Sequence, residues 1–257
     1  MEIKKKTMVQ NNTSSSPWIL VKPRKTRARV RLFCFPYAGG GASIFRFLTE
    51  QSLPDIEICP VQLPGREGRF TEEPFDSLEE LLSPLYQELL PFLEGPYAFF
   101  GHSMGALISF ELTRLIYQKE QVPGPVRLFV SGHRAPHLPD SKLPLHALPD
   151  LQLIEALHDL NGTPKDVLNH SELLNLMLPL LRADFALCET YTYKPGTVLA
   201  CPISAFGGLQ DDGVPREAIL AWREHTESSF RAHFFAGDHF FLHKEQPKVL
   251  AVLLANL

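Results

Sequence analysis

Short apolar runs alternate along most of the chain with segments in which apolar residues recur at helical spacing. The runs are bounded by glycine, proline or charged residues, which is typical of strands buried in a sheet. We expect strands over residues 18–22, 29–36, 56–61, 97–100, 126–131, 203–206 and 228–235.

Between these runs, apolar residues recur every three or four positions, which predicts amphipathic helices. The clearest stretch is 77–93, whose leucines share one helical face. Further helices are expected over 43–50, with Ser43 as N-cap, and over 107–118 and 247–257. The alternation favours an α/β fold with a mostly parallel sheet covered by helices on both faces.

One stretch, residues 134–198, breaks this alternation because it contains helical patterns and no convincing strand pattern. We expect helices over 151–160 and 173–191, and the second is apolar on nearly every side. Such a helix is covered on more than one side, either as an ordinary core helix or as part of a cap over an apolar substrate tunnel. Its place between two sheet strands favours an inserted helical lid within a single domain spanning 17–257.

The N-terminal segment differs from the rest in composition. Residues 1–16 are polar and of low complexity, which predicts a disordered tail. The basic residues that follow suggest either a solvated tail with a charged edge strand or a docking surface for an acidic protein. They are Lys4, Lys5, Lys6, Lys22, Arg24, Lys25, Arg27, Arg29 and Arg31.

Composition narrows the class of protein. The chain has 257 residues, 44% of them hydrophobic, and a net charge of −4, which suits one large domain and argues against nucleic acid as a partner. We find neither an apolar run long enough to span a membrane nor a signal-peptide pattern, so we expect a cytoplasmic protein. Its four cysteines form no C-x-x-C pair, which predicts free thiols in a reducing compartment.

The pentapeptide Gly101-His102-Ser103-Met104-Gly105 follows a predicted strand and opens a predicted helix. A serine between two glycines in this setting is typical of a nucleophile elbow, the strained turn that exposes the nucleophile of α/β-hydrolases. We therefore interpret Ser103 as the nucleophile of an acyl hydrolase.

A serine hydroxyl needs a base, and in α/β-hydrolases the chain order is serine, acid, histidine. His239 lies in the sequence Gly-Asp-His-Phe before the last predicted helix, where the base is expected. The acid is expected after a late strand, in the loop 207–213, which contains Asp211 and Asp212. The spacing of the loop does not choose between these two residues.

Two backbone N–H groups are expected to form the oxyanion hole. One belongs to Met104, which follows the nucleophile, and we assign the other to Ala38 in the loop 35–42 after an early strand. The glycines of this loop lack the spacing of a nucleotide-binding motif. The histidines are not accompanied in the sequence by other metal-binding residues at ligand spacing, so we predict no metal site.

Five segments together resemble the type II thioesterases, the stand-alone editing enzymes of non-ribosomal peptide and polyketide pathways. The resemblance runs from about residue 18 to the C-terminus. The segments are 32–40 (LFCFPYAGG), 63–67 (LPGRE), 101–105 (GHSMG), 181–185 (LRADF) and 237–241 (GDHFF). The segments LPGRE and LRADF are far more specific for this family than the nucleophile-elbow pentapeptide is.

The resemblance implies an α/β-hydrolase with a mobile lid that removes misprimed or stalled acyl groups from the phosphopantetheine arm of carrier proteins. It favours Asp211 over Asp212 as the acid, because Val214 follows Asp211 by three residues. It implies no cofactor, since phosphopantetheine belongs to the substrate. We expect a monomer whose partners are carrier-protein domains.

Other functions fit the same motifs. A medium-chain fatty acyl thioesterase, a small-molecule esterase or an acyltransferase would use the same three residues. A non-catalytic carrier-protein adaptor on a hydrolase scaffold would need none of them. Acyl preference separates the first from an editing enzyme, and covalent labelling of Ser103 by a fluorophosphonate would count against the adaptor.

Overall fold

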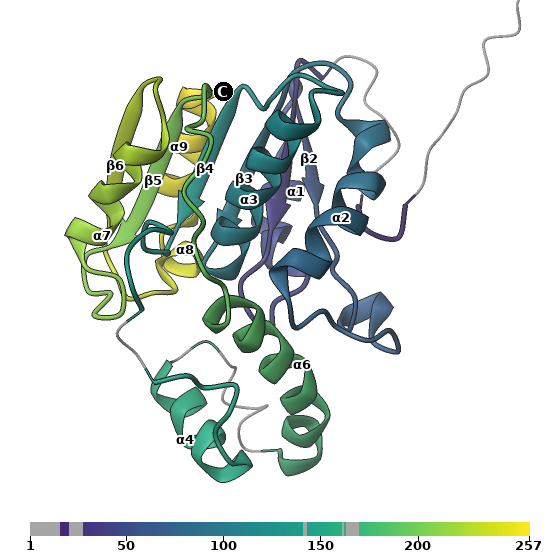
Figure 1. Ribbon diagram of the computed structural model, residues 1–257, viewed down its shortest axis with the longest axis vertical. Coiled ribbons are helices and arrows are strands. Elements are labelled where there is room, and N and C mark those ends of the chain that lie inside the picture. Colours follow the sequence, from purple (N-terminus) through teal and green to yellow (C-terminus); the bar gives the residue numbers. More distant parts are fainter. Residues whose placement is uncertain (1–15, 21–27, 141–142, 161, 163–169) are drawn as a thin grey trace, which may run out of the picture.

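The computed structural model describes residues 16–20, 28–140, 143–160, 162 and 170–257 (Figure 1). Within them one six-stranded sheet has the order β2-β1-β3-β4-β5-β6, and every neighbouring pair is parallel. The mostly parallel sheet expected from the sequence is confirmed. The strands are β1 (Val30–Phe35), β2 (Ile56–Pro60), β3 (Tyr97–His102), β4 (Arg127–Ser131), β5 (Ile203–Gly208) and β6 (Phe230–Phe235).

Helices cover both faces of the sheet (Figure 1). One face packs against α2 (Leu78–Leu89), α3 (Met104–Lys119) and α7 (Arg216–Leu220). The other packs against α1 (Arg46–Thr49), α8 (Phe241–Lys244) and α9 (Gln246–Asn256). Strand β3 is buried along its whole length, as a parallel strand with two covered faces must be.

Two helices, α4 (Asp150–Leu160) and α6 (Ser171–Glu189), lie between β4 and β5 in the chain. Figure 1 places them below the sheet, at the carboxyl ends of its strands. They share a cluster of buried leucines that includes Leu153, Leu157 and Leu178. The two helices expected in this stretch are confirmed, and its described residues form no strand.

The structure describes only a small part of the N-terminal segment. The predicted tail lies outside the described residues except for Ser16, as do the basic residues from Lys4 to Arg27. In the described part of 18–22, Ile19 forms only isolated bridges, to Ser16 and Val61, so a strand there is not observed.

The prediction of a charged edge strand is wrong. Strand β1 lies in the interior of the sheet, between β2 and β3. Arg31 is not solvated, because its guanidinium lies 2.7 Å from Glu57 on β2 and donates to the Phe92 carbonyl at 2.6 Å. A charge near the amino end of an interior strand is tolerated here because a neighbouring strand neutralises it.

Ser43 is not a helix N-cap. It lies inside a 3₁₀ turn, Ala42–Phe45, and its hydroxyl donates to the Glu67 carboxylate at 2.5 Å. The α-helical part begins only at Arg46. The serine pattern was misleading because the side chain pairs with a residue far along the chain rather than with the next turn.

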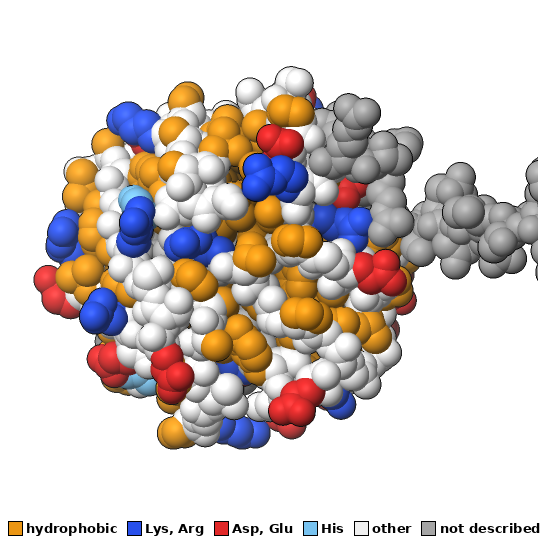
Figure 2. Space-filling view, turned by 90° about the horizontal axis from the view of Figure 1, so that it is seen from above, with side chains coloured by type: hydrophobic (Ala, Val, Ile, Leu, Met, Phe, Trp, Pro, Cys, Tyr) orange, Lys and Arg blue, Asp and Glu red, His pale blue; other side chains and the backbone are white. Residues whose placement is uncertain are grey.

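No helix among the described residues is long and apolar enough to cross a membrane. Figure 2 looks on to the end of the molecule opposite α4 and α6, and there basic, acidic and hydrophobic side chains are interspersed over the described part of the surface. This mixture is ordinary for a protein surface.

A buried histidine, His225, pairs with the half-buried His137 beside the sheet. The His225 and His137 ring nitrogens lie 2.7 Å apart, and the Phe110 ring packs against His225. Burial, followed by the neighbouring His137 and then Arg114, lowers the pKa of His225 to about 4. The native state therefore holds this ring neutral at pH values where an exposed histidine is protonated.

We expect stability to fall as pH drops from about 6.5 to about 4, because the unfolded chain then binds a proton that native His225 excludes. Above about pH 6.5 this contribution is fully present. His225→Gln should reduce the slope of unfolding free energy against pH by up to about 1.4 kcal/mol per pH unit, measured by urea titration at several pH values. The matched control is His158→Gln, the same substitution at an exposed histidine. Equal slopes in the His225 variant and the wild type would contradict this account.

Candidate active site

Ser103 occupies a strained turn between β3 and α3. Its φ of 54° and ψ of −117° lie outside the conformations that non-glycine residues normally adopt. The turn is possible because its neighbours lack side chains. A Cβ at Gly101 would lie 2.0 Å from the Gly105 oxygen, and one at Gly105 would lie 2.1 Å from the Phe35 oxygen. The two glycines of the pentapeptide are thus required by close backbone approach.

The elbow is tied to the adjacent strand β4. The Ser103 N–H donates to the Ser131 carbonyl at 2.7 Å, and the Ser131 hydroxyl lies 2.8 Å from Nδ1 of His102. His102 is fully buried, and burial together with the nearby His239 holds its pKa well below the ordinary value. His102 is therefore a neutral packing residue that supports the turn.

The structure brings Ser103, His239 and Asp211 together. Nε2 of His239 lies 3.0 Å from Oγ of Ser103, and Nδ1 lies 2.8 Å from Oδ2 of Asp211. The other Asp211 oxygen accepts the N–H groups of Gly213 and Val214, at 3.0 and 3.1 Å. These bonds hold the carboxylate in a fixed orientation.

Of the two acid candidates, only Asp211 faces the histidine. The Asp211 side chain is 4% exposed, whereas Asp212 is exposed to solvent. A buried carboxylate that accepts hydrogen bonds on both oxygens is well suited to hold one tautomer of an imidazole.

The acid and the histidine lie on loops that are hydrogen-bonded to each other. The Gln210 N–H donates to the Gly237 carbonyl at 2.9 Å, and the Gln210 side chain accepts the Gly237 N–H at 2.5 Å. Gly208 lets the two loops approach, since a Cβ there would lie 2.4 Å from the Asp238 oxygen. Sequence reasoning missed Gln210, because its role depends on β5 and β6 being neighbours in the sheet.

The two expected oxyanion-hole residues lie at the same edge of the sheet. Met104 is the first residue of α3 and is buried. Ala38 lies in the loop after β1, and the contact between Gly105 and Phe35 places that loop beside the first turn of α3. Both residues are therefore next to the elbow.

The glycine loop after Ala38 is held by side chains from other segments. The Gly39 N–H donates to the Asp184 carboxylate at 2.7 Å. The Ala42 N–H donates to the Gln62 side-chain oxygen at 3.0 Å, and the Ser43 N–H donates to the Glu67 carboxylate at 3.2 Å. Two of these three acceptors are carboxylates, so the loop is a poor site for a phosphate, in agreement with its glycine spacing.

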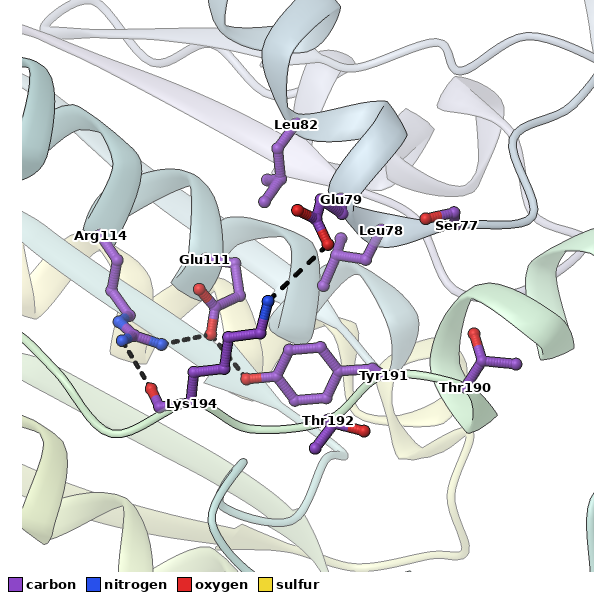
Figure 3. A pocket seen from close by; sticks show the side chains of 10 residues that line it. All are labelled: Ser77, Leu78, Glu79, Leu82, Glu111, Arg114, Thr190, Tyr191, Thr192 and Lys194. Atoms are coloured by element: carbon purple, nitrogen blue, oxygen red, sulfur yellow. Dashed lines mark hydrogen bonds and ion pairs between the residues drawn. The ribbon is translucent and has the colours of Figure 1, made fainter.

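A pocket of about 360 Å³ lies away from Ser103, His239 and Asp211, between α2, α3 and the chain after α6 (Figure 3). Figure 3 shows its charged groups paired with one another. Glu111 accepts from Arg114 at 2.7 Å and from the Tyr191 hydroxyl at 2.6 Å, and Arg114 also donates to the Lys194 carbonyl at 2.8 Å. These bonds fasten the chain after α6 to α3.

Among the described residues, no group of three or more histidine, cysteine or acidic side chains is arranged to hold a metal ion. Cys34, Cys59 and Cys201 are buried, Cys188 is half-buried, and all four are free thiols. Burial raises the pKa of the Cys34, Cys59 and Cys188 thiols and that of Cys201, the last to about 11. They are packing residues rather than nucleophiles.

Comparison with known proteins gives the family. A model of the thioesterase domain family matches residues 30–257. The gramicidin S biosynthesis protein GrsT of Aneurinibacillus migulanus is 46% identical over 240 residues, which cover 93% of each chain. The medium-chain S-acyl fatty acid synthase thioesterase of Rattus norvegicus is 33% identical, covering 83% of this chain and 82% of the relative.

A solved structure extends the likeness to three dimensions. The type II thioesterase BorB, from the borrelidin biosynthetic cluster, superposes with a TM-score of 0.85 at 35% identity, covering 95% of this chain and 99% of that one. The resemblance noted in the sequence is thereby confirmed. The chain belongs to the thioesterase domain family, and it is a thioester hydrolase of the α/β-hydrolase fold.

Proposed function

We propose that this enzyme hydrolyses acyl thioesters on the phosphopantetheine arm of carrier proteins, and that it clears misprimed or stalled acyl groups during non-ribosomal peptide or polyketide synthesis. The hydrogen-bonded series Ser103–His239–Asp211, in a member of the thioesterase family, is the observation that carries the proposal. The high identity to a gramicidin S biosynthesis protein supports the pathway class.

In the proposed reaction Oγ of Ser103 attacks the thioester carbonyl carbon while Nε2 of His239 takes the hydroxyl proton. Asp211 holds the imidazole in the required tautomer and stabilises the imidazolium. The negative charge that develops on the carbonyl oxygen is stabilised by the N–H groups of Ala38 and Met104. The carbon–sulfur bond then breaks, and the thiolate leaves with the proton from His239.

The second half of the reaction regenerates the serine. Water attacks the acyl-enzyme carbonyl as His239 accepts one of its protons, and the resulting oxyanion uses the same two N–H groups. Collapse releases the acid and returns the proton to Ser103. The chemistry draws on the chain's own residues and on water, with phosphopantetheine as part of the substrate.

We propose that α4 and α6, within residues 134–198, act as a lid over this site in a single domain spanning 17–257. Leu181 of α6 lies against the glycine loop, where a Cβ on Gly39 would be 2.6 Å from its Cδ2 atom. Gly162 lies against Phe240, next to the histidine, with a Cβ there 2.3 Å from the ring. Both contacts support a lid that lies close to the reacting groups.

The proposal takes one chain as the working unit and a carrier-protein domain as its partner. A single chain supplies Ser103, His239, Asp211 and both expected oxyanion donors, so the proposed chemistry needs no second copy of the chain. The four free thiols suit the cytoplasm, where thiols stay reduced.

The test is mass spectrometry of carrier proteins loaded with acetyl, aminoacyl or dodecanoyl groups, before and after exposure to the enzyme, with Ser103→Ala as control. We expect acetyl and aminoacyl carriers to be unloaded at least about tenfold faster than the dodecanoyl carrier, a difference of about 1.4 kcal/mol in activation free energy. A reversed preference would favour the medium-chain thioesterase.

Two further outcomes would reject the proposal. Hydrolysis of simple esters without carrier unloading would favour a small-molecule esterase. Absence of both activities, together with no labelling of Ser103 by a fluorophosphonate, would favour the non-catalytic adaptor.

A further inference from the structure

A buried ion pair joins the two most distinctive segments of the sequence. Two guanidinium nitrogens of Arg66, in LPGRE, donate to the two carboxylate oxygens of Asp184, in LRADF, at 2.8 Å each. The side chains are 4% and 1% exposed. A bidentate pair with this burial fixes the relative position of its partners, which lie 118 residues apart in the sequence.

Both members of the pair also hold the loop that follows Ala38. Asp184 accepts the Gly39 N–H at 2.7 Å, and Arg66 donates to the Gly40 carbonyl at 3.2 Å. Gly40 in turn donates its N–H to the Tyr37 carbonyl at 2.9 Å. The pair therefore holds the Gly39 and Gly40 backbone in the tight turn from Tyr37 to Gly40.

This turn sets the direction of the Ala38 N–H. The Tyr37 carbonyl and the Ala38 N–H belong to one planar trans peptide, so they point in opposite directions. Once Gly40 fixes the Tyr37 carbonyl, the Ala38 N–H is fixed as well. A change in the Arg66–Asp184 pair would rotate the expected oxyanion donor without touching substrate.

The part of α6 that carries Asp184 is itself well anchored. Leu181 contacts Gly39, and beyond the helix Tyr191 donates to Glu111 of α3 at 2.6 Å. The position of Asp184 is therefore set by its contacts with the body of the protein and not by the far end of the lid.

We infer that Arg66 and Asp184 are positioning residues for the oxyanion hole, and that they act by holding the Tyr37–Gly40 turn so that the Ala38 N–H meets the developing charge. The inference rests on the proposed function only for the identity of the substrate. Its geometry applies to any reagent that forms a tetrahedral adduct on Ser103.

The test uses the double variant Arg66→Gln/Asp184→Asn, which removes both charges, since breaking one member alone leaves a buried unpaired charge. Asparagine keeps the size of Asp184, and glutamine is a shorter, neutral polar replacement for Arg66. We expect fluorophosphonate labelling of Ser103 to slow by about 10- to 100-fold, in line with a displaced oxyanion donor. A boronic acid that mimics the tetrahedral intermediate should lose affinity by a similar factor. A non-hydrolysable thioether analogue of the acyl-pantetheine should bind within about twofold of the wild type.

The matched control is Arg31→Gln/Glu57→Gln, which removes another ion pair with little exposure, 13% and 7%, between β1 and β2. It should label within about twofold of the wild-type rate. The inference is overturned if the Arg66/Asp184 variant labels at the wild-type rate. It is also overturned if boronate and thioether affinities fall by the same factor, because that indicates general damage to the site.

If the double variant does not fold, as judged by circular dichroism, Arg66→Lys carries the test. Lysine keeps the buried charge but cannot reproduce the bidentate geometry together with the bond to Gly40. We expect labelling about five- to tenfold slower, and an unchanged rate would overturn the inference. Because labelling needs no carrier protein, a wild-type enzyme that labels but unloads no carrier would count against the proposed function alone.

Discussion

Ser103→Ala is expected to lower kcat/KM for acyl-carrier hydrolysis by about 10⁴- to 10⁶-fold, the largest effect of any single substitution considered for this protein. The physical reason is that the substitution removes the Oγ atom that lies 3.0 Å from Nε2 of His239. Residual turnover should reflect only binding and the oxyanion donors.

The same substitution should leave the fold intact. The elbow depends on Gly101 and Gly105 and on the Ser103 backbone, none of which the change to alanine removes. We expect the urea midpoint to stay within the error of the wild type while activity, measured by release of free carrier thiol, disappears. A folded variant that retains full activity would exclude Ser103 as the nucleophile.

Asp211→Asn is expected to lower kcat by about 10³- to 10⁴-fold with a much smaller effect on KM. Asparagine is nearly isosteric and can still accept the N–H groups of Gly213 and Val214 through its carbonyl. Its amide cannot stabilise the imidazolium of His239, and it favours the wrong tautomer when its NH₂ faces Nδ1.

Asp212→Asn is the matched control, because it makes the same chemical change one residue away on an exposed side chain. It should keep kcat within about twofold of the wild type, as surface substitutions usually do. Equal losses in the two variants, or a larger loss in Asp212→Asn, would reject Asp211 as the acid.

Much of the fold could be predicted from hydrophobic spacing. The strands from β1 to β6 and the helices α2, α3, α4, α6 and α9 all fall within or beside the ranges expected from the sequence. The short helices α7 and α8, of five and four residues, were not expected, because so few residues do not establish a helical period. Apart from the wrong expectation of a charged edge strand at β1, the order of the strands in the sheet was not predicted, since it depends on contacts between segments far apart in the chain.

The residues of the candidate site could also be predicted in part from the sequence. Ser103 and His239 could be picked out because the elbow and the Gly-Asp-His-Phe motif are local patterns. The choice between Asp211 and Asp212 rested on a resemblance rather than on spacing. Both lie in one polar loop, and only the tertiary structure turns one of them towards the imidazole.

By itself, the sequence determined the α/β architecture and the resemblance to thioesterases, and it indicated the candidate nucleophile with its base. Each of these features depends on patterns of residues that lie close together along the chain. The tertiary structure alone decided that Asp211 faces His239, that Gln210 joins their loops, and that Arg66 pairs with Asp184 behind the glycine loop. Those contacts join segments separated by up to 118 residues, and only packing of the sheet and its helices brings them within hydrogen-bond distance.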